Sequence, residues 1–148
     1  WITLFWARLG EGAKVEENLR ALYANSTFPN LMDNHPSKRG PVFQIDGNYG
    51  TTAAMAECLA QVSYDGVKPQ AVSLLPALPP RWQSGAVQGL CLPGGACLDL
   101  VWKNGTLQTA ALHAAAPWKM RLHCADADEE IELSAGQSVT LNAALQPM

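Results

Sequence analysis

The spacing of apolar residues changes once along the chain, from helical in the first part to alternating in the second. Up to about Ser63 apolar residues recur every three or four positions, and from Lys68 onward they alternate with polar ones. In the first part, Glu16 and Arg20 stand four residues apart, in the order that stabilises an exposed helix. Three helices are predicted there, over residues 1–9, 12–24 and 51–62.

The alternating part predicts short strands joined by tight turns. Asn104-Gly105 between two alternating runs is a strong signal for a two-residue hairpin. We therefore expect an antiparallel module with the form of a small β-sandwich, which makes the whole chain α+β. The strands are expected over residues 72–75, 86–92, 96–102, 106–113, 118–124, 130–133 and 138–141.

Composition and charge exclude several classes of function. The 148 residues are 48% hydrophobic and 16% charged, which is ordinary for a soluble globular protein. A net charge of −3 argues against a nucleic-acid partner, which would require a basic cluster. Arg, Gly or Pro interrupts the apolar runs well short of a membrane span, so no membrane partner is expected. The four cysteines lack the close spacing of a zinc ligand set, so no metal is expected.

A long loop between the second and third predicted helices carries the candidate chemistry. It has little periodicity but too many apolar residues for a disordered segment, so we expect it to be ordered and functional. Six polar side chains are candidates: Asp33, Asn34, His35, Gln44, Asp46 and Asn48.

Asp46 stands out because it lies just ahead of the helix predicted at Thr51. The positive end of a helix favours an ionised carboxylate, and an ionised, oriented carboxylate suits a general base. A cap or turn role for Asp46 explains the same residues. Around it, Gly47 and Gly50 are expected to adopt a positive φ. Gln44 and Asn48 are expected to hydrogen-bond backbone groups.

The order of motifs resembles the C-terminal part of glycoside hydrolase family 95, the inverting α-L-fucosidases. The most specific motifs are Gln44-Ile45-Asp46-Gly47-Asn48 and Leu74-Leu75-Pro76-Ala77-Leu78-Pro79. The resemblance implies that residues 1–66 are the last helices of an (α/α)6 catalytic barrel and that residues 67–148 form a β-sandwich-like C-terminal domain. The rest of the barrel and an earlier β-sandwich domain are then expected upstream in the same polypeptide.

The same resemblance implies roles for two residues. Asp46 matches the family's aspartate on the base side of the reaction. His35 matches the histidine of a His-Pro step that contacts the sugar, although here residues 37–42 separate that step from Phe43-Gln44-Ile45-Asp46. The general acid, a glutamate, and the asparagines that hold the water belong to upstream segments. The 148 residues alone are therefore expected to be an inactive fragment.

The expected substrate is a fucosylated oligosaccharide or glycan with terminal, α-1,2-linked α-L-fucose. Acid–base hydrolysis needs no cofactor, and none is expected. Three alternatives stay open: α-L-galactose as the sugar, another (α/α)6-barrel hydrolase or lyase, and a non-catalytic carbohydrate-binding or structural β module. Enzymes that digest glycans are commonly exported, so a secreted or periplasmic bacterial location is expected, with its signal upstream.

Overall fold

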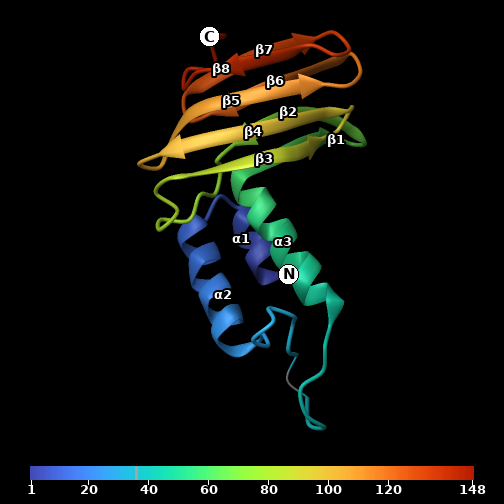
Figure 1. Ribbon diagram of the computed structural model, residues 1–148, viewed down its shortest axis with the longest axis vertical. Helices are drawn as coiled ribbons and strands as arrows, with labels where there is room; N and C mark the ends of the chain where they lie inside the picture. Colours follow the sequence, from blue (N-terminus) through green and yellow to red (C-terminus); the bar gives the residue numbers. More distant parts are fainter. Residues whose placement is uncertain (36) are drawn as a thin grey trace. The chain divides into compact units, whose positions relative to one another are not determined.

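The computed structural model describes residues 1–35 and 37–148, which form three helices followed by eight strands (Figure 1). The chain divides into two compact units. The helical unit consists of Trp1–Cys58 together with Ala77–Arg81, and the strand unit consists of Leu59–Pro76 together with Trp82–Met148. Each unit has its own core and is described separately.

The helical unit contains α1 (Ile2–Arg8), α2 (Gly12–Asn25) and α3 (Ile45–Leu59). The first two helices lie close to the predicted ranges, but the third does not. Helix α3 begins six residues before Thr51 and ends at Leu59, and the following residues form strand β1 (Ala60–Asp65) instead of a last helical turn. The buried face of α3 comes from positions three or four residues apart: Thr51, Ala54 and Cys58.

The segment Ala77–Arg81 packs against the start of α2. A Cβ atom at Gly12 would lie 2.4 Å from the carbonyl oxygen of Leu78, so only glycine permits this approach. Further along α2, Glu16 Oε1 pairs with Arg81 Nε at 3.3 Å, and Glu16 Oε2 accepts a hydrogen bond from the Arg81 backbone N–H at 3.0 Å. The local pattern on α2 predicts Arg20 as the partner of Glu16, whereas the structure pairs Glu16 with a residue far along the chain.

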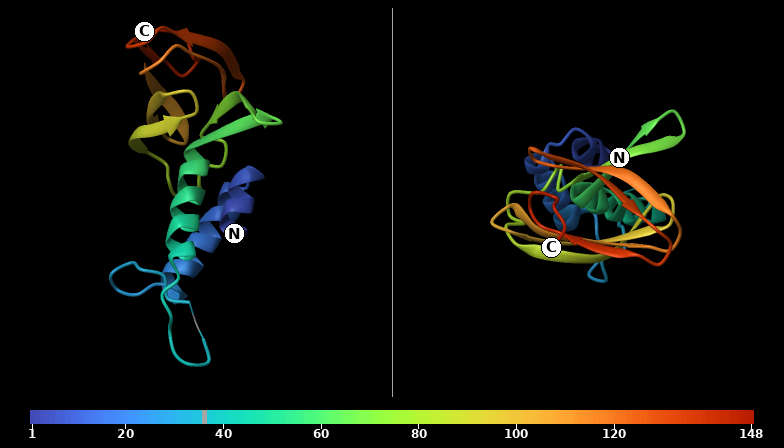
Figure 2. Two further views of the ribbon diagram at one scale, coloured as in Figure 1. Left: turned by 90° about the vertical axis from the view of Figure 1, so that its right-hand side faces the viewer. Right: turned by 90° about the horizontal axis from the view of Figure 1, so that it is seen from above.

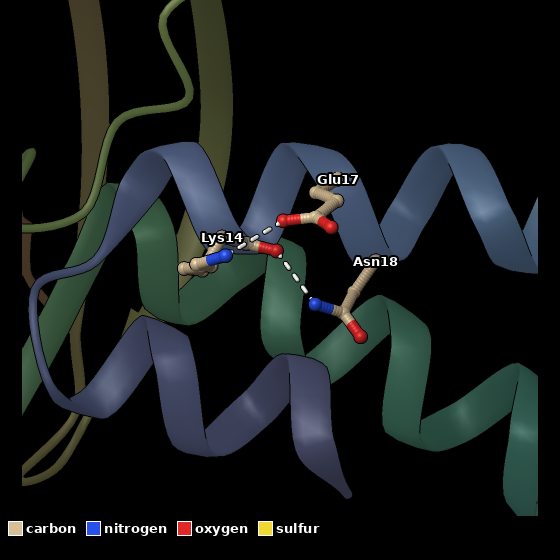
Figure 3. Close-up of polar contacts among 3 residues, drawn as sticks. All are labelled: Lys14, Glu17 and Asn18. Atoms are coloured by element: carbon tan, nitrogen blue, oxygen red, sulfur yellow. Dashed lines mark hydrogen bonds and ion pairs between the residues drawn. The ribbon is translucent and has the colours of Figure 1, made fainter.

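The solvent side of α2 carries short-range polar contacts (Figure 3). Lys14 Nζ lies 3.0 Å from Glu17 Oε2, and Asn18 Nδ2 donates to the Lys14 carbonyl oxygen at 2.8 Å. Exposed pairs of this kind contribute less than about 1 kcal/mol. The helix is therefore held mainly by its buried face, where Val15 and Leu19 lie.

The strand unit contains two four-stranded sheets, whose strands twist strongly in Figure 2. One sheet has the order β1-β2-β6-β7 and adds to β1 the strands β2 (Lys68–Leu74), β6 (Trp118–Cys124) and β7 (Ala127–Leu133). The other has the order β3-β4-β5-β8, from β3 (Gly85–Leu92), β4 (Ala96–Lys103), β5 (Thr106–Ala114) and β8 (Ser138–Leu141). Two sheets rich in antiparallel pairs are compatible with the predicted β-sandwich. The purely antiparallel module is wrong in one respect, because β2 pairs with β6 in parallel.

Buried and exposed side chains alternate along the inner strands, so each sheet has one apolar face. Leu98 and Leu100 on β4 are fully buried, as is Leu122 on β6. Two tryptophans belong to this core. Trp102 donates its indole N–H to the Trp82 carbonyl oxygen at 2.7 Å, and Trp118 donates to the Pro93 carbonyl oxygen at 2.9 Å.

No helix in the described residues has both the length and the apolar character required to cross a membrane.

Arg8 and Glu57 generate a prediction about the helical unit, because they join α1 to α3 with an N–O distance of 2.7 Å. Burial raises the pKa of Glu57 above 4.5, and the charge and hydrogen bond of Arg8 oppose that rise. We expect Arg8→Ala to lower the free energy of unfolding at pH 7 by up to about 1 kcal/mol, because it removes the ion pair. The loss should become smaller as the pH falls through the raised pKa of Glu57, because the carboxylate charge that attracts Arg8 is then lost.

Denaturant unfolding at pH 7 and pH 4 measures this difference, and Glu57→Gln provides the matched background. In Glu57→Gln the Arg8→Ala change should cost the same at pH 7 and pH 4. An equal loss at the two pH values in the wild-type background would contradict the prediction.

Candidate functional site

A hollow of about 470 Å³ lies beside the start of α3, within the helical unit. It has polar side chains from the loop between α2 and α3 and from the first turns of α3. Trp1, Thr3 of α1 and Leu22 of α2 complete its wall. The lining residues are Trp1, Thr3, Leu22, Asp33, His35, Gln44, Asp46, Gly47, Gly50 and Thr51. The sequence analysis gives an expected role to five residues in this region. His35, Gln44, Asp46 and Gly47 line this hollow, and Asn48 lines a smaller neighbouring one.

Asp46 lies in the first turn of α3 and is exposed to solvent. It is thus part of the helix rather than of a turn ahead of it. The partial positive charge of a helix start acts within the first turn, and Asp46 lies in that turn. It therefore still acts on the Asp46 carboxylate. An exposed carboxylate at the wall of a polar hollow can receive a proton from a water molecule held in it.

The supporting turn expected around Asp46 is also replaced by helix. Gly47 and Gly50 are helical, and neither is among the positive-φ glycines of the described residues, so that expectation is wrong. Glycine is required at position 47 for a steric reason instead. A Cβ atom at Gly47 would lie 2.3 Å from Asp33 Oδ1, so the missing side chain makes room for the Asp33 carboxylate.

Asn48 fastens the preceding loop to α3. Its Oδ1 accepts a hydrogen bond from the Asp33 backbone N–H at 2.8 Å, and its Nδ2 donates to the Leu31 carbonyl oxygen at 2.9 Å. Leu31 has a φ of 65°, a left-handed conformation that is unfavourable for a side-chain-bearing residue. Asn48 thus satisfies backbone groups, as predicted, but those of the loop rather than those around Asp46.

The residues inserted after His35 form a small projection that leaves His35 near Asp46 along the cavity wall. His35 and Val42 exchange two backbone hydrogen bonds, of 2.9 and 3.0 Å. Between them, Ser37 Oγ donates to the Gly40 carbonyl oxygen at 2.6 Å. Figure 1 shows this loop extending beyond the ends of α2 and α3. Because the bridge returns the chain to His35, the insertion does not remove His35 from the hollow.

Pro36, the second residue of the His-Pro step, lies outside the described residues. Of that step the structure therefore places only His35, which is exposed and lines the hollow.

Asp33 is a wall residue that the sequence analysis includes among its six polar candidates without giving it a specific role. Its side chain is 8% exposed, and its Oδ2 is buried without a hydrogen-bond partner in the described part of the chain. An unsatisfied buried acceptor costs about 1–3 kcal/mol, and more when it is charged. No spacing rule reveals this position, because its burial depends on Gly47 and Asn48, more than ten residues away.

Metal-ligand geometry is not found in residues 1–35 and 37–148. No three His, Cys, Asp or Glu side chains among them gather closely enough to hold an ion. The hollow therefore offers carboxylates, an imidazole and an amide as hydrogen-bonding and acid–base groups.

Both parts of the chain match models of one protein family. Residues 1–59 match the glycosyl hydrolase family 95 catalytic domain, and residues 67–145 match the glycoside hydrolase family 95 C-terminal domain. The class is thus a glycoside hydrolase, and the chain belongs to family 95.

Curated relatives include "Alpha-L-fucosidase 2" of Arabidopsis thaliana, which is 31% identical over 119 residues and covers 72% of this chain. "Probable alpha-fucosidase A" of Aspergillus niger is 31% identical over 110 residues and covers 70%. The protein of the same name from Aspergillus oryzae is 32% identical over 113 residues, again 70% of this chain. The matched regions span only 13%, 14% and 15% of these relatives.

The contact between Gly47 and Asp33 generates a prediction with a matched control in the same helix. Gly47→Ala should destabilise the protein by about 1–3 kcal/mol, because the new methyl group collides with the Asp33 carboxylate. At Gly50 a Cβ atom meets nothing within 4 Å, so Gly50→Ala should raise stability by up to about 1 kcal/mol through its helix propensity.

Thermal and denaturant unfolding of both variants measures the difference. Similar stability changes at the two positions would show that the Gly47–Asp33 contact is not tight.

Proposed function

We propose that this chain supplies one side of the active site of an inverting α-L-fucosidase that removes terminal, α-1,2-linked fucose from glycans. The observation that carries the proposal is the convergence of Asp46, His35 and Gln44 on one polar hollow in a member of family 95. The names of the three relatives, all α-fucosidases or probable α-fucosidases, support the choice of sugar.

Asp46 is the proposed base-side residue. Inverting hydrolysis requires an acid that protonates the leaving oxygen and a base that activates water on the opposite face of the sugar. As the water oxygen attacks the anomeric carbon, its proton passes toward Asp46, and the carbon inverts. No glutamate is among the hollow's described lining residues. The general acid is therefore proposed to come from another part of the whole protein.

His35 is the proposed sugar contact. A neutral imidazole has one N–H donor and one acceptor nitrogen, so it can hydrogen-bond a sugar hydroxyl group in either sense. Gln44, Gly47 and Asn48 are proposed to support Asp46 and the loop that delivers His35. This chemistry uses no cofactor.

The surface of α1 supports placing residues 1–66 in an (α/α)6 barrel. The family match of residues 67–145 supports placing residues 67–148 in a C-terminal domain. Trp1 is 86% exposed and Phe5 is 55% exposed, and Ile2 and Leu9 are exposed beside them. Such an apolar surface indicates an interaction site. Further helices of the same polypeptide are its proposed partners.

Substitution of Asp46 in the whole protein tests the proposal. With a fucosyl-α-1,2-galactose substrate, we expect Asp46→Asn and Asp46→Ala to lower kcat by about 10²- to 10⁴-fold, because proton acceptance from water is lost. NMR of the released sugar should show the inverted anomer in the wild type. Asp65→Asn, at an exposed aspartate of the strand unit, is the matched control and should leave kcat unchanged.

Near-normal turnover in Asp46→Asn would contradict the base role and indicate that Asp46 only stabilises the start of the helix. Faster release of α-L-galactose than of α-L-fucose would keep the mechanism and change the sugar.

Substitution of His35 tests the sugar contact. We expect His35→Ala to lower kcat/KM about tenfold through a raised KM, because one hydrogen bond to the sugar is lost. Lys38→Ala, on the exposed projection that follows, should have no effect. Equal losses in the two variants would indicate that the projection as a whole matters, rather than the imidazole.

A further inference from the structure

Asp33 carries a buried carboxylate that the proposed hydrolysis does not use. Its Oδ2 receives no hydrogen bond from any described residue, although the side chain is only 8% exposed. Buried polar groups in native proteins are almost always paired, so an unpaired carboxylate oxygen requires an explanation. A ligand that brings its own donor is one such explanation.

The fold holds the backbone of Asp33 in place beside the start of α3. Asn48 Oδ1 binds the Asp33 backbone N–H, and Asp33 also forms a β-bridge with Thr27. Gly47 leaves the space that the carboxylate occupies. The Asp33 backbone is therefore fixed, and its side chain lies against Gly47.

Asp33 lines the same hollow as His35 and Asp46. The torsion of a carboxylate group is broad and twofold, so either oxygen can turn toward the cavity. An ionised carboxylate only accepts hydrogen bonds, so its complement must be a donor. Two carboxylates repel an anionic ligand, and the described residues provide no metal-binding cluster. A ligand rich in hydroxyl groups, such as the sugar of the proposed function, supplies a donor of this kind.

We propose that Asp33 is a sugar-binding residue whose carboxylate accepts a hydrogen bond from one hydroxyl group of the sugar in the hollow. This inference rests on the proposed function and deepens it, because it assigns a specificity contact to a second carboxylate. A site with a buried acceptor discriminates strongly against a substrate that lacks the matching hydroxyl group. Acidic sugars are excluded by the same charge.

The test measures kcat/KM of the whole protein on an α-L-fucoside and on its 2-, 3- and 4-deoxy analogues. The wild type should lose about 10- to 100-fold on one analogue through the Asp33 contact. Asp33→Ala should lose a similar factor on the parent fucoside and nothing further on that analogue, because the hydroxyl group and its acceptor form one interaction. Asp33→Asn keeps the shape and one acceptor oxygen, so it should show a smaller loss with the same pattern.

Asn48→Ala is the control for a structural role, because it loosens the same loop and leaves the carboxylate intact. It should lower kcat/KM equally for all four substrates. The proposal is overturned if Asp33→Ala also lowers all four equally, or if it changes none of them. If Asp33→Ala does not fold, the same panel with Asp33→Asn decides.

A binding measurement separates failure of this inference from failure of the proposed function. L-Fucose, its deoxy analogues and L-galactose are titrated calorimetrically into the wild type and into Asp33→Asn. Suppose that fucoside hydrolysis depends on Asp46, but that substitution of Asp33 does not change the preference for any one hydroxyl group. That result would overturn the inference alone. Absence of hydrolysis, with sugar binding that still depends on Asp33 and one hydroxyl group, would overturn the proposed function alone.

Discussion

The close approach of Asp33 to Gly47 is the constraint on which the candidate site depends. It requires glycine at position 47, two residues after α3 begins at Ile45. Once that approach is made, Asn48 reaches both Asp33 and Leu31 and fixes the loop. The same few residues that begin the helix therefore also set the position of the loop that carries the cavity wall.

This arrangement explains how a long and irregular loop can present chemistry reliably. The loop has two anchors, the Asn48 side chain at one point and the paired backbones of His35 and Val42 at another. Residues between the anchors can vary in number while the anchored side chains keep their places. Such a design separates the part of the loop that tolerates insertion from the part that meets a ligand.

Periodicity predicted most of the elements, because burial of one face imposes it directly. Strands β6 and β8 have the predicted limits, and α1 and α2 are within a residue or so of theirs. The start of α3 was missed because Asp46, Gly47 and Asn48 favour turns when judged alone. Long-range contacts to the preceding loop override that preference. The parallel pairing of β2 with β6 was missed for a similar reason, since an alternating pattern does not reveal which strand lies alongside.

The site was predictable only as far as residue type and motif allowed. Asp46, His35 and Gln44 line one hollow, whereas their roles there stay predictions. The burial of Asp33 and the true partner of Glu16 depend on atoms brought together from distant segments. A single sequence contains no local signal for such long-range contacts. The residues next to Asp33 and Glu16 in the sequence are like those next to many solvent-exposed acidic residues.

Ala77–Arg81 belongs to the helical unit although it follows two strands of the strand unit in the sequence. This affects how chimeras of family members can be constructed. This pentapeptide lies inside the stretch that matches the C-terminal domain, yet it fills the space over Gly12 and pairs with Glu16. A chimera that exchanges the C-terminal domain between two family members would also exchange these five residues. The foreign segment would then have to fit the recipient's α2, so a productive crossover belongs after Arg81, or must carry compensating changes at Gly12 and Glu16.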